Sequence, residues 1–253
     1  MTYLYGLLDG ENAPDTADLD GVTGTVGATR LARGWLIHGP GAETEILPRR
    51  RHLLAHARVQ ERLMEQGTLL PMRFGMVVPD LTAVMALIAH RHEEITGHFD
   101  RLAGKVEIGL RVAFPREAAL EATLHADAAL RQEHNRLTRQ QKPPHFAVAE
   151  FGRRLAEALD RNRGAAQRRL IAALRDGWDA YVLKTPDSDV EVLAVECLIP
   201  VAAVDAVAAR AQEEARALAS FAGEAEPLVR IVGPLPAFHF VTLSLAAAEP
   251  AEA

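Results

Sequence analysis

The alternation of apolar and polar positions in the first hundred residues predicts one compact α+β unit. Residues 2–9 form a short, continuously apolar run, and residues 27–39 have the pattern of a strand or tight hairpin. A helix is expected from residue 48 to about 66, because it opens with proline and is followed by glycine. A second helical periodicity runs from 79 to 104.

The segment between these helices, residues 68–78, has the sequence TLLPMRFGMVV. Its pattern predicts a strand bent at Pro71 and Gly75. Arg73 stands inside this apolar run, and a buried charge is costly unless it is paired. Two interpretations follow. Arg73 forms an ion pair with a carboxylate of the same domain, which its apolar surroundings favour, or it lies on a surface that contacts a partner.

The second half of the chain has the element order β-α-β-β-α-β. The expected elements are a strand at 105–114, an Ala/Arg/Gln-rich helical insertion at 116–142, a long helix at 145–175, strands at 179–184 and 190–199, a helix at 201–220, and strands near 227–232 and 237–245. This order is that of a modified ferredoxin-like fold with an insertion after its first strand. The predicted fold class is therefore α+β with two domains, 1–104 and 105–245, followed by a disordered tail at 246–253.

Composition narrows the functional classes. The chain has 253 residues and a formal net charge of −6, which argues against a dedicated nucleic-acid binder. Its longest apolar tract is interrupted by Glu196, Pro200 and Asp205, so no membrane span is predicted. No secretory signal is visible, and a cytoplasmic protein is expected. The single cysteine, Cys197, excludes an internal disulfide and is expected to be buried and inert.

The charges are unevenly distributed. Residues 131–175 contain eleven Lys/Arg and four Asp/Glu, whereas the chain from Asp187 onward contains eleven Asp/Glu and three Arg. Such asymmetry suggests contacts between elements or between neighbours in an assembly. The long helix carries most of the positive charge, and its face is expected to be solvated or to meet an acidic protein surface. Its arginines are Arg153, Arg154, Arg161, Arg163, Arg168 and Arg169.

No catalytic, metal or cofactor site is predicted. The nucleotide-binding pattern GxxxxGK[ST] and the nucleophile elbow GxSxG are both missing from the sequence. His52 and His56 have the i, i+4 spacing of metal ligands, but three arginines precede them, and the segment HLLAH lacks the glutamate of HExxH. These histidines, like the others, are expected to be solvated.

Four stretches taken together resemble one protein family. They are TYLYGLL at the start, RRHLLAHARVQERLMEQGTLLPMRFGMVV, GKVEIGLRV, and VRIVGPLPAFHFV near the end. In this order they are similar to the signatures of the gas vesicle protein family GvpF/GvpL, and they span nearly the whole chain. The late motif departs from the family pattern, with Leu235 where tryptophan is common and Phe238 where tyrosine is common. The F and L subgroups are not distinguished.

The resemblance implies an accessory or minor structural role in building the gas-filled shell that provides buoyancy, without enzymatic activity or cofactor. It implies contacts with the small hydrophobic shell protein and other accessory proteins, and a location in the gas vesicle, or in the cytoplasm before assembly. Edge strands of a ferredoxin-like sheet would suit such contacts. The candidate contact residues are Arg73, Arg153, Arg154, Arg161 and Phe238.

Two other functions remain open from the sequence. One is a haem- or small-molecule-binding ferredoxin-like enzyme, in which His145 or His239 would be offered as axial ligand. The other is a regulatory module that binds a metabolite between paired domains.

Overall fold

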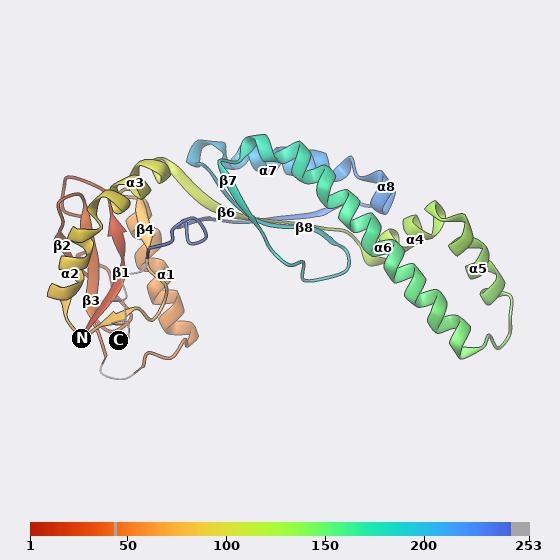
Figure 1. Cartoon of the computed structure of the whole chain (residues 1–253), viewed down its shortest axis with the longest axis horizontal. Coiled ribbons are helices and arrows are strands. Elements are labelled where there is room, and N and C mark those ends of the chain that lie inside the picture. The colour runs from red at the N-terminus through yellow and green to blue at the C-terminus, as the bar shows by residue number, and fades with distance from the viewer. Residues whose placement is uncertain (43–44, 244–253) are drawn as a thin grey trace, which may run out of the picture. The chain divides into compact units, whose positions relative to one another are not determined.

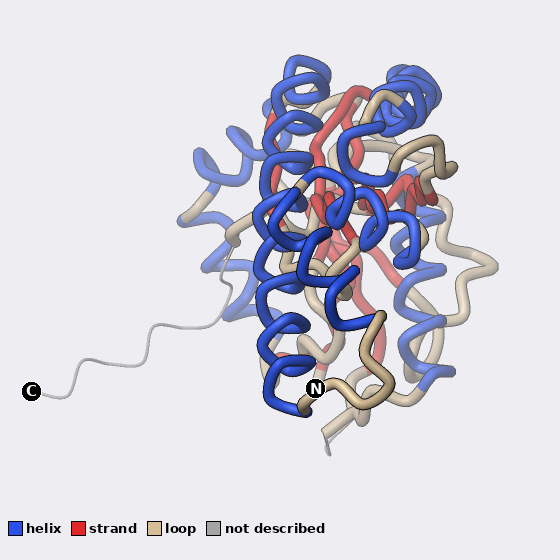
Figure 2. The backbone as a smooth tube through the Cα atoms, turned by 90° about the vertical axis from the view of Figure 1, so that its right-hand side faces the viewer, coloured by secondary structure: helices blue, strands red, loops and turns tan. Residues whose placement is uncertain are grey.

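The computed structural model describes residues 1–42 and 45–243, so the predicted tail at 246–253 lies outside the described residues. The chain packs into two compact units. The first contains residues 1–107 together with the segment from Pro234, and the second contains residues 108–233. Both units combine helices with β-structure (Figures 1 and 2).

The first unit is organised around strand β1. The sheet has the order β2-β3-β1-β4, and β5 also pairs with β1. Its strands are β1 (Thr2–Leu8), β2 (Gly27–Arg30), β3 (Trp35–Pro40), β4 (Leu69–Pro71) and β5 (Val77–Val78). All its pairings are antiparallel. β1 lies in the middle of the sheet, which explains why it is apolar at nearly every position.

The hairpin expected within residues 27–39 is present, and its turn requires a glycine. Arg30 is opposite Trp35, and Gly34 between them has a φ of +75°. A Cβ at Gly34 would lie 2.2 Å from the carbonyl oxygen of Leu8, so both the backbone conformation and the close approach favour glycine.

Helices cover this sheet. They are α1 (Arg50–Met64), α2 (Leu81–His90) and α3 (His92–Leu102). The single helix expected from 79 to 104 is in fact two helices, because Arg91 leaves the helical conformation with φ −98° and ψ 21°. Asp80 caps α2 by accepting a hydrogen bond from the main-chain N–H of Thr82 at 2.8 Å.

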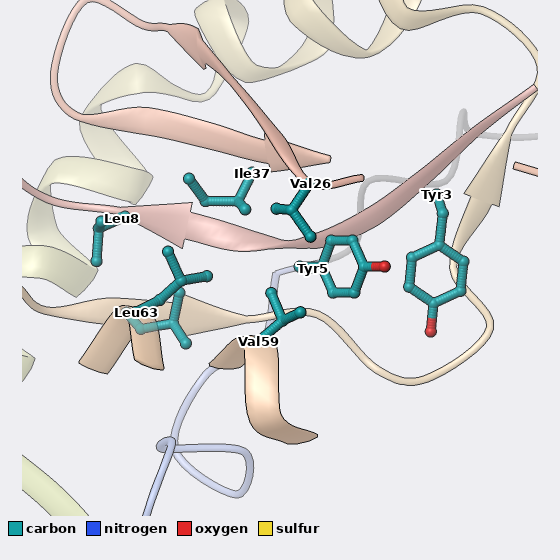
Figure 3. Close-up of a cluster of buried hydrophobic side chains, with 8 residues drawn as sticks. Tyr3, Tyr5, Leu8, Val26, Ile37, Val59 and Leu63 are labelled. Atoms are coloured by element: carbon teal, nitrogen blue, oxygen red, sulfur yellow. The ribbon is translucent and has the colours of Figure 1, made fainter. Parts of the chain in front are cut away.

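The core of the first unit lies between α1 and the sheet, and its buried residues come from both (Figure 3). The buried members of this cluster are Tyr3, Tyr5, Leu8, Val26, Ile37, Val59, Leu63 and Leu69. The buried side of α1 presents His56, Val59, Gln60 and Leu63 at helical spacing, and two of these four residues are polar.

The sheet of the second half has the order β7-β8-β6-β9. Its strands are β6 (Lys105–Ala113), β7 (Ala180–Leu183), β8 (Glu191–Pro200) and β9 (Leu228–Leu235). β8 is buried along nine consecutive residues, as expected for an inner strand with both faces covered. β7 forms an outer edge and pairs antiparallel with β8.

The helices of the second half match the predicted order. They are α4 (Arg116–Ala126), α5 (Ala128–Thr138), α6 (His145–Leu174), α7 (Val204–Arg216) and the short α8 (Ala219–Ala222), with 3₁₀ turns at Arg175–Gly177 and Val201–Ala203. The insertion is a helical pair divided at Asp127, whose side chain caps α5. Both α4 and α5 pack against α6.

The prediction of a strand at 237–245 is wrong for residues 237–243. Residues 244–245 lie outside the described part of the chain. The segment after β9 turns instead, with the N–H of Phe238 donating to the carbonyl of Pro236 at 2.7 Å. Pro236 has no N–H to continue a ladder of β-sheet hydrogen bonds. The apolar pattern there reflects packing rather than strand pairing, because Ala237 and Phe240 are buried.

Among the described residues, no helix is long and apolar enough to cross a membrane.

Candidate functional site

The stretch that carries Arg73 is an edge strand interrupted by a turn. β4 pairs with one end of β1, at Gly6–Leu8, and β5 pairs with the other end, at Thr2–Tyr3. Residues 72–76 form the turn between them, and Gly75 within it has a φ of +85°. The bent strand predicted for residues 68–78 is therefore present as two short strands, with the bend in the turn that follows Pro71 and contains Gly75.

Buried polar side chains of α1 hold this turn in place. The carbonyl of Met72 accepts hydrogen bonds from His56 Nε2 at 3.1 Å and from Gln60 Nε2 at 2.9 Å. Gln60 Nε2 also donates to the carbonyl of Tyr5 at 2.8 Å. At the other side of the turn, the N–H of Gly75 donates to the Tyr3 hydroxyl at 3.0 Å. The turn is thus fixed at both ends by groups that are inaccessible to water.

The protonation of His56 follows from these bonds. Nε2 faces a carbonyl, which can only accept, so Nε2 carries the proton. Nδ1 then accepts from the Tyr3 hydroxyl at 2.9 Å. Burial lowers the pKa of His56 to about 4, and burial raises the pKa of Tyr3 to about 12. Both side chains are therefore neutral near pH 7.

Ring packing reinforces the same arrangement. The rings of Tyr3 and Tyr5 have centroids 4.8 Å apart, and Tyr5 stacks on His56 at 5.6 Å. Phe74, inside the turn, meets the edge of His56 at 5.8 Å. Figure 3 shows the two tyrosine side chains next to each other. Such contacts restrict the turn to one conformation.

Arg73 itself points away from this core. Its side chain is exposed, and it forms no ion pair with any residue in the described part of the chain. The expected internal ion pair is therefore not formed with any carboxylate of residues 1–42 and 45–243. The turn carries the guanidinium into water, which removes the desolvation penalty that would have required a buried carboxylate.

The exposed face of α1 carries a second positive surface. Arg51, Leu54 and Arg58 follow one another at i, i+3 and i+7, with Arg50 alongside at i−4 from Leu54. No ion pair of these three arginines occurs within residues 1–42 and 45–243. Leu53 and Leu54 are 42% and 44% exposed. We call Arg50, Arg51, Leu54 and Arg58 the α1 stripe.

The other predicted contact residues lie elsewhere. Arg153, Arg154 and Arg161 share helix α6 of the second unit, whereas Phe238 follows β9 in the first unit and is 36% exposed. Arg153 lies between Glu150 and Glu157, and its hydrogen bond lowers the pKa of Glu150.

Arg154 is paired with Glu133 of α5. Arg161 is exposed and has no ion pair with a described residue. Of the three predicted arginines on α6, only Arg161 therefore retains an uncompensated charge.

Sequence reasoning missed the structural use of two histidines. His56 is buried, not solvated, and both of its ring nitrogens are occupied, so it cannot act with His52 as a metal-binding pair. The signal was its position on the apolar stripe of α1. Similarly, His239 Nδ1 lies 2.7 Å from a carboxylate oxygen of Glu107, and the His239 main-chain N–H donates to the same carboxylate at 2.9 Å. This satisfies the buried side chain of Glu107.

A separate candidate interface is the outer edge of β7. Tyr181, Val182 and Leu183 are consecutive, and they are 43%, 37% and 46% exposed. Consecutive strand residues point to opposite faces, so the strand is uncovered on both sides. An exposed apolar edge is prone to accept a further strand.

The architecture defines a mixed α/β protein with two antiparallel sheets and several helices. The chain belongs to the gas vesicle synthesis protein GvpL/GvpF family, whose model matches residues 1–242. This is not a known enzyme family.

Relatives and solved structures agree with this family. Gas vesicle protein F of a Streptomyces species is 27% identical over 252 residues, covering 95% of this chain and 99% of that protein. Gas vesicle protein F of Dolichospermum flosaquae is 28% identical over 139 residues, which is 53% of this chain and 56% of that protein, so this match spans little more than half of either. The crystal structure of GvpF from an Anabaena species superposes with a TM-score of 0.79 at 21% identity, covering 96% and 98% of the two chains.

Proposed function

We propose that this protein is an accessory or minor structural component of gas vesicle assembly. In this role it binds the small hydrophobic shell protein and other accessory proteins, supports nucleation of the shell, and resides in the gas vesicle or, before assembly, in the cytoplasm. Family membership supports the gas vesicle role.

We further propose two domains, 1–104 and 105–245. The two compact units support this division in outline, although they divide the chain after residue 107 and group the segment from Pro234 with the first unit. The second domain is a modified ferredoxin-like fold. Support comes from the element order β6, α6, β7, β8, α7, β9 and from the sheet order β9-β6-β8-β7. If the four strands are numbered 1 to 4 in chain order, β6 to β9, their order in the sheet is 4-1-3-2. Helices α4 and α5 form the helical insertion.

The proposal that this chain binds the shell protein rests on the exposed edge of β7. A protein that lines a gas space must be rich in apolar, strand-forming sequence, and such sequence aggregates in water before it is assembled. The β7 edge offers unpaired main-chain groups together with three exposed apolar side chains. A shell-protein strand added at this edge would satisfy its own main chain and cover its apolar side chains.

Co-expression of the shell protein tests this role. We expect the soluble yield of the shell protein to rise with this chain present, and the two proteins to purify together. Replacing Val182 and Leu183 by lysine should return the yield to that without the chain, because lysines on an edge oppose strand addition.

The matched control is Val201→Lys with Ala202→Lys, which adds the same two charges at exposed residues of the second unit that lie outside any strand. It should leave the yield unchanged. Equal yields with and without the chain would rule out the chaperone-like role, and equal loss in both lysine variants would rule out the β7 edge.

The predicted residues Arg73, Arg161 and Phe238 are proposed as contacts with other accessory proteins, since all three are exposed. Arg153 and Arg154 are proposed for the same surface of α6, although their charges are already balanced by neighbouring glutamates. Single replacements by glutamine, or Phe238→Ser, followed by pairwise pull-down with each accessory protein, would test each residue separately.

A further inference from the structure

The first unit carries a second set of unbalanced charges, of opposite sign to the α1 stripe. Four exposed carboxylates lie in the loop of residues 9–20, and none has an ion pair with a described residue. They are Glu11, Asp15, Asp18 and Asp20. We call this segment the acidic loop.

The acidic loop is anchored rather than free. The N–H of Asp15 donates to Gln66 Oε1 at 2.7 Å, and Gln66 Nε2 donates back to the carbonyl of Asp15 at 3.1 Å. The guanidinium of Arg30 donates to the carbonyls of Gly10 and Glu11 at 2.8 and 3.1 Å. These bonds hold the main chain, so the carboxylates are presented to solvent on a fixed support.

The two charged surfaces lie towards opposite ends of the same helix. The stripe begins at Arg50, and the loop is tied to Gln66, just after α1 ends. Gln66 lies eight residues after Arg58 and sixteen residues after Arg50, which at the rise of an α-helix corresponds to about 12 Å and about 24 Å. Both distances exceed the screening length of about 8 Å at physiological salt, so the stripe and the loop do not neutralise each other within one molecule.

We propose that the α1 stripe of one chain docks the acidic loop of a second copy. The charges are complementary, and both surfaces are present on every molecule. The exposed Leu54 of the stripe faces a partner loop that offers exposed Ala13 and Ala17. The contact thus combines a small apolar centre with a charged rim.

This contact joins two different surfaces, so it does not close upon itself after two copies. Each added chain leaves one free stripe and one free loop, and association continues head to tail as a row. Exposed ion pairs are individually weak and are screened by salt. The association is therefore concentration-dependent at low ionic strength, and we expect it to weaken by about tenfold or more at about 0.5 M NaCl.

Two neutralising variants of the full chain test the arrangement. The stripe variant is Arg50→Gln with Arg51→Gln and Arg58→Gln, and the loop variant is Asp15→Asn with Asp18→Asn and Asp20→Asn. In sedimentation velocity at low salt, each variant alone should be monomeric. A mixture of the two should form a 1:1 dimer and nothing larger, because only the intact loop of the first and the intact stripe of the second can meet.

The control removes three positive charges elsewhere. Arg161→Gln with Arg168→Gln and Arg169→Gln changes exposed residues of α6 and should associate like the parent protein. Thermal unfolding of each variant confirms that it is folded. The proposal is overturned if the parent is monomeric at every concentration in low salt, if it stops at a closed dimer, if the mixture stays monomeric, or if the α6 control loses association equally. The shell-protein co-expression assay uses β7, so the two proposals fail independently.

Discussion

Helices α1 and α6 are both rich in arginine, but they differ in how many of these arginines have a carboxylate partner nearby. On α6, Arg153 lies between two glutamates of its own helix, and Arg163 pairs with Asp160. On α1, only Arg62 has such a partner, Glu65. Positions three and four residues after Arg50 and Arg51 are leucine or alanine, so no carboxylate is within reach along the helix.

This comparison shows that counting charges along the sequence does not reveal which charges are balanced by their neighbours. The segment with the largest excess of positive charge, 131–175, is partly neutralised by its own neighbours. The α1 stripe is smaller, but its three arginines form no ion pair with a described residue, and a buried hydrogen-bond network separately fixes the turn that presents Arg73. An uncompensated charge on a rigid support is the better candidate for a contact.

The largest effect is expected at the support of the Arg73 turn. Replacing His56 by alanine removes the acceptor of the Tyr3 hydroxyl and one donor to Met72, and it leaves a cavity. We expect a loss of roughly 3–5 kcal/mol in the free energy of unfolding. Urea denaturation measures it. A loss below 1 kcal/mol would show that this network does not hold the turn.

A pH dependence of nearly the same size should come from the same histidine. Its pKa is about 4 in the folded chain and near 6.5 when unfolded, so the unfolded state binds more protons between these values. The contribution of His56 to the free energy of unfolding is therefore fully present above pH 6.5. It is lost as the pH drops towards 4, and the loss is about 3 kcal/mol at most.

Comparison with His56→Gln isolates this effect in urea titrations at several pH values. Burial also lowers the pKa of His38 and His98, so these residues contribute a dependence of the same sign in both proteins. An unchanged slope in the variant would assign the pH dependence to them instead.

A smaller effect is expected from the partly buried pair that balances α6. Arg154 and Glu133 join α6 to α5, and the Glu133 side chain is 19% exposed. We expect a coupling of about 1 kcal/mol in a double-mutant cycle of Arg154→Gln and Glu133→Gln. Zero coupling would mean that Glu133 does not hold Arg154 in place. Arg154 would then be available to a partner.

The smallest effect, and one of opposite sign, is expected on α1. Its first turn has arginines and no acidic residue, although the positive end of the helix dipole favours acidic side chains there. Arg50→Glu should therefore raise the free energy of unfolding by about 0.3–1 kcal/mol while weakening self-association.

Arg73→Gln should change the free energy of unfolding by no more than about 0.5 kcal/mol. Loss of stability in either variant would show that these arginines serve the fold.

Much of the fold could be predicted because it rests on local patterns. The strand at 2–9, the hairpin at 27–39 and the long helix at 145–175 follow from burial periodicity, and each is present. The break at Arg91 and the turn after β9 could not be predicted, since apolar side chains there pack without continuing a helix or a ladder. Periodicity records which side chains are buried, but it does not record which main-chain groups are paired.

The candidate site divides in the same way. Family membership, the bent strand around Arg73 and the arginine-rich helices were readable from the sequence, because motifs and spacing are local properties. Only the tertiary structure decided that Arg73 is exposed, that His56 is a neutral core residue, and which arginines of α1 and α6 have a carboxylate partner. Those outcomes depend on which carboxylates, carbonyls and waters lie within a few ångströms of each side chain. Residues brought together from distant parts of the chain settle that question, as His56 does with Tyr3 and Arg154 does with Glu133.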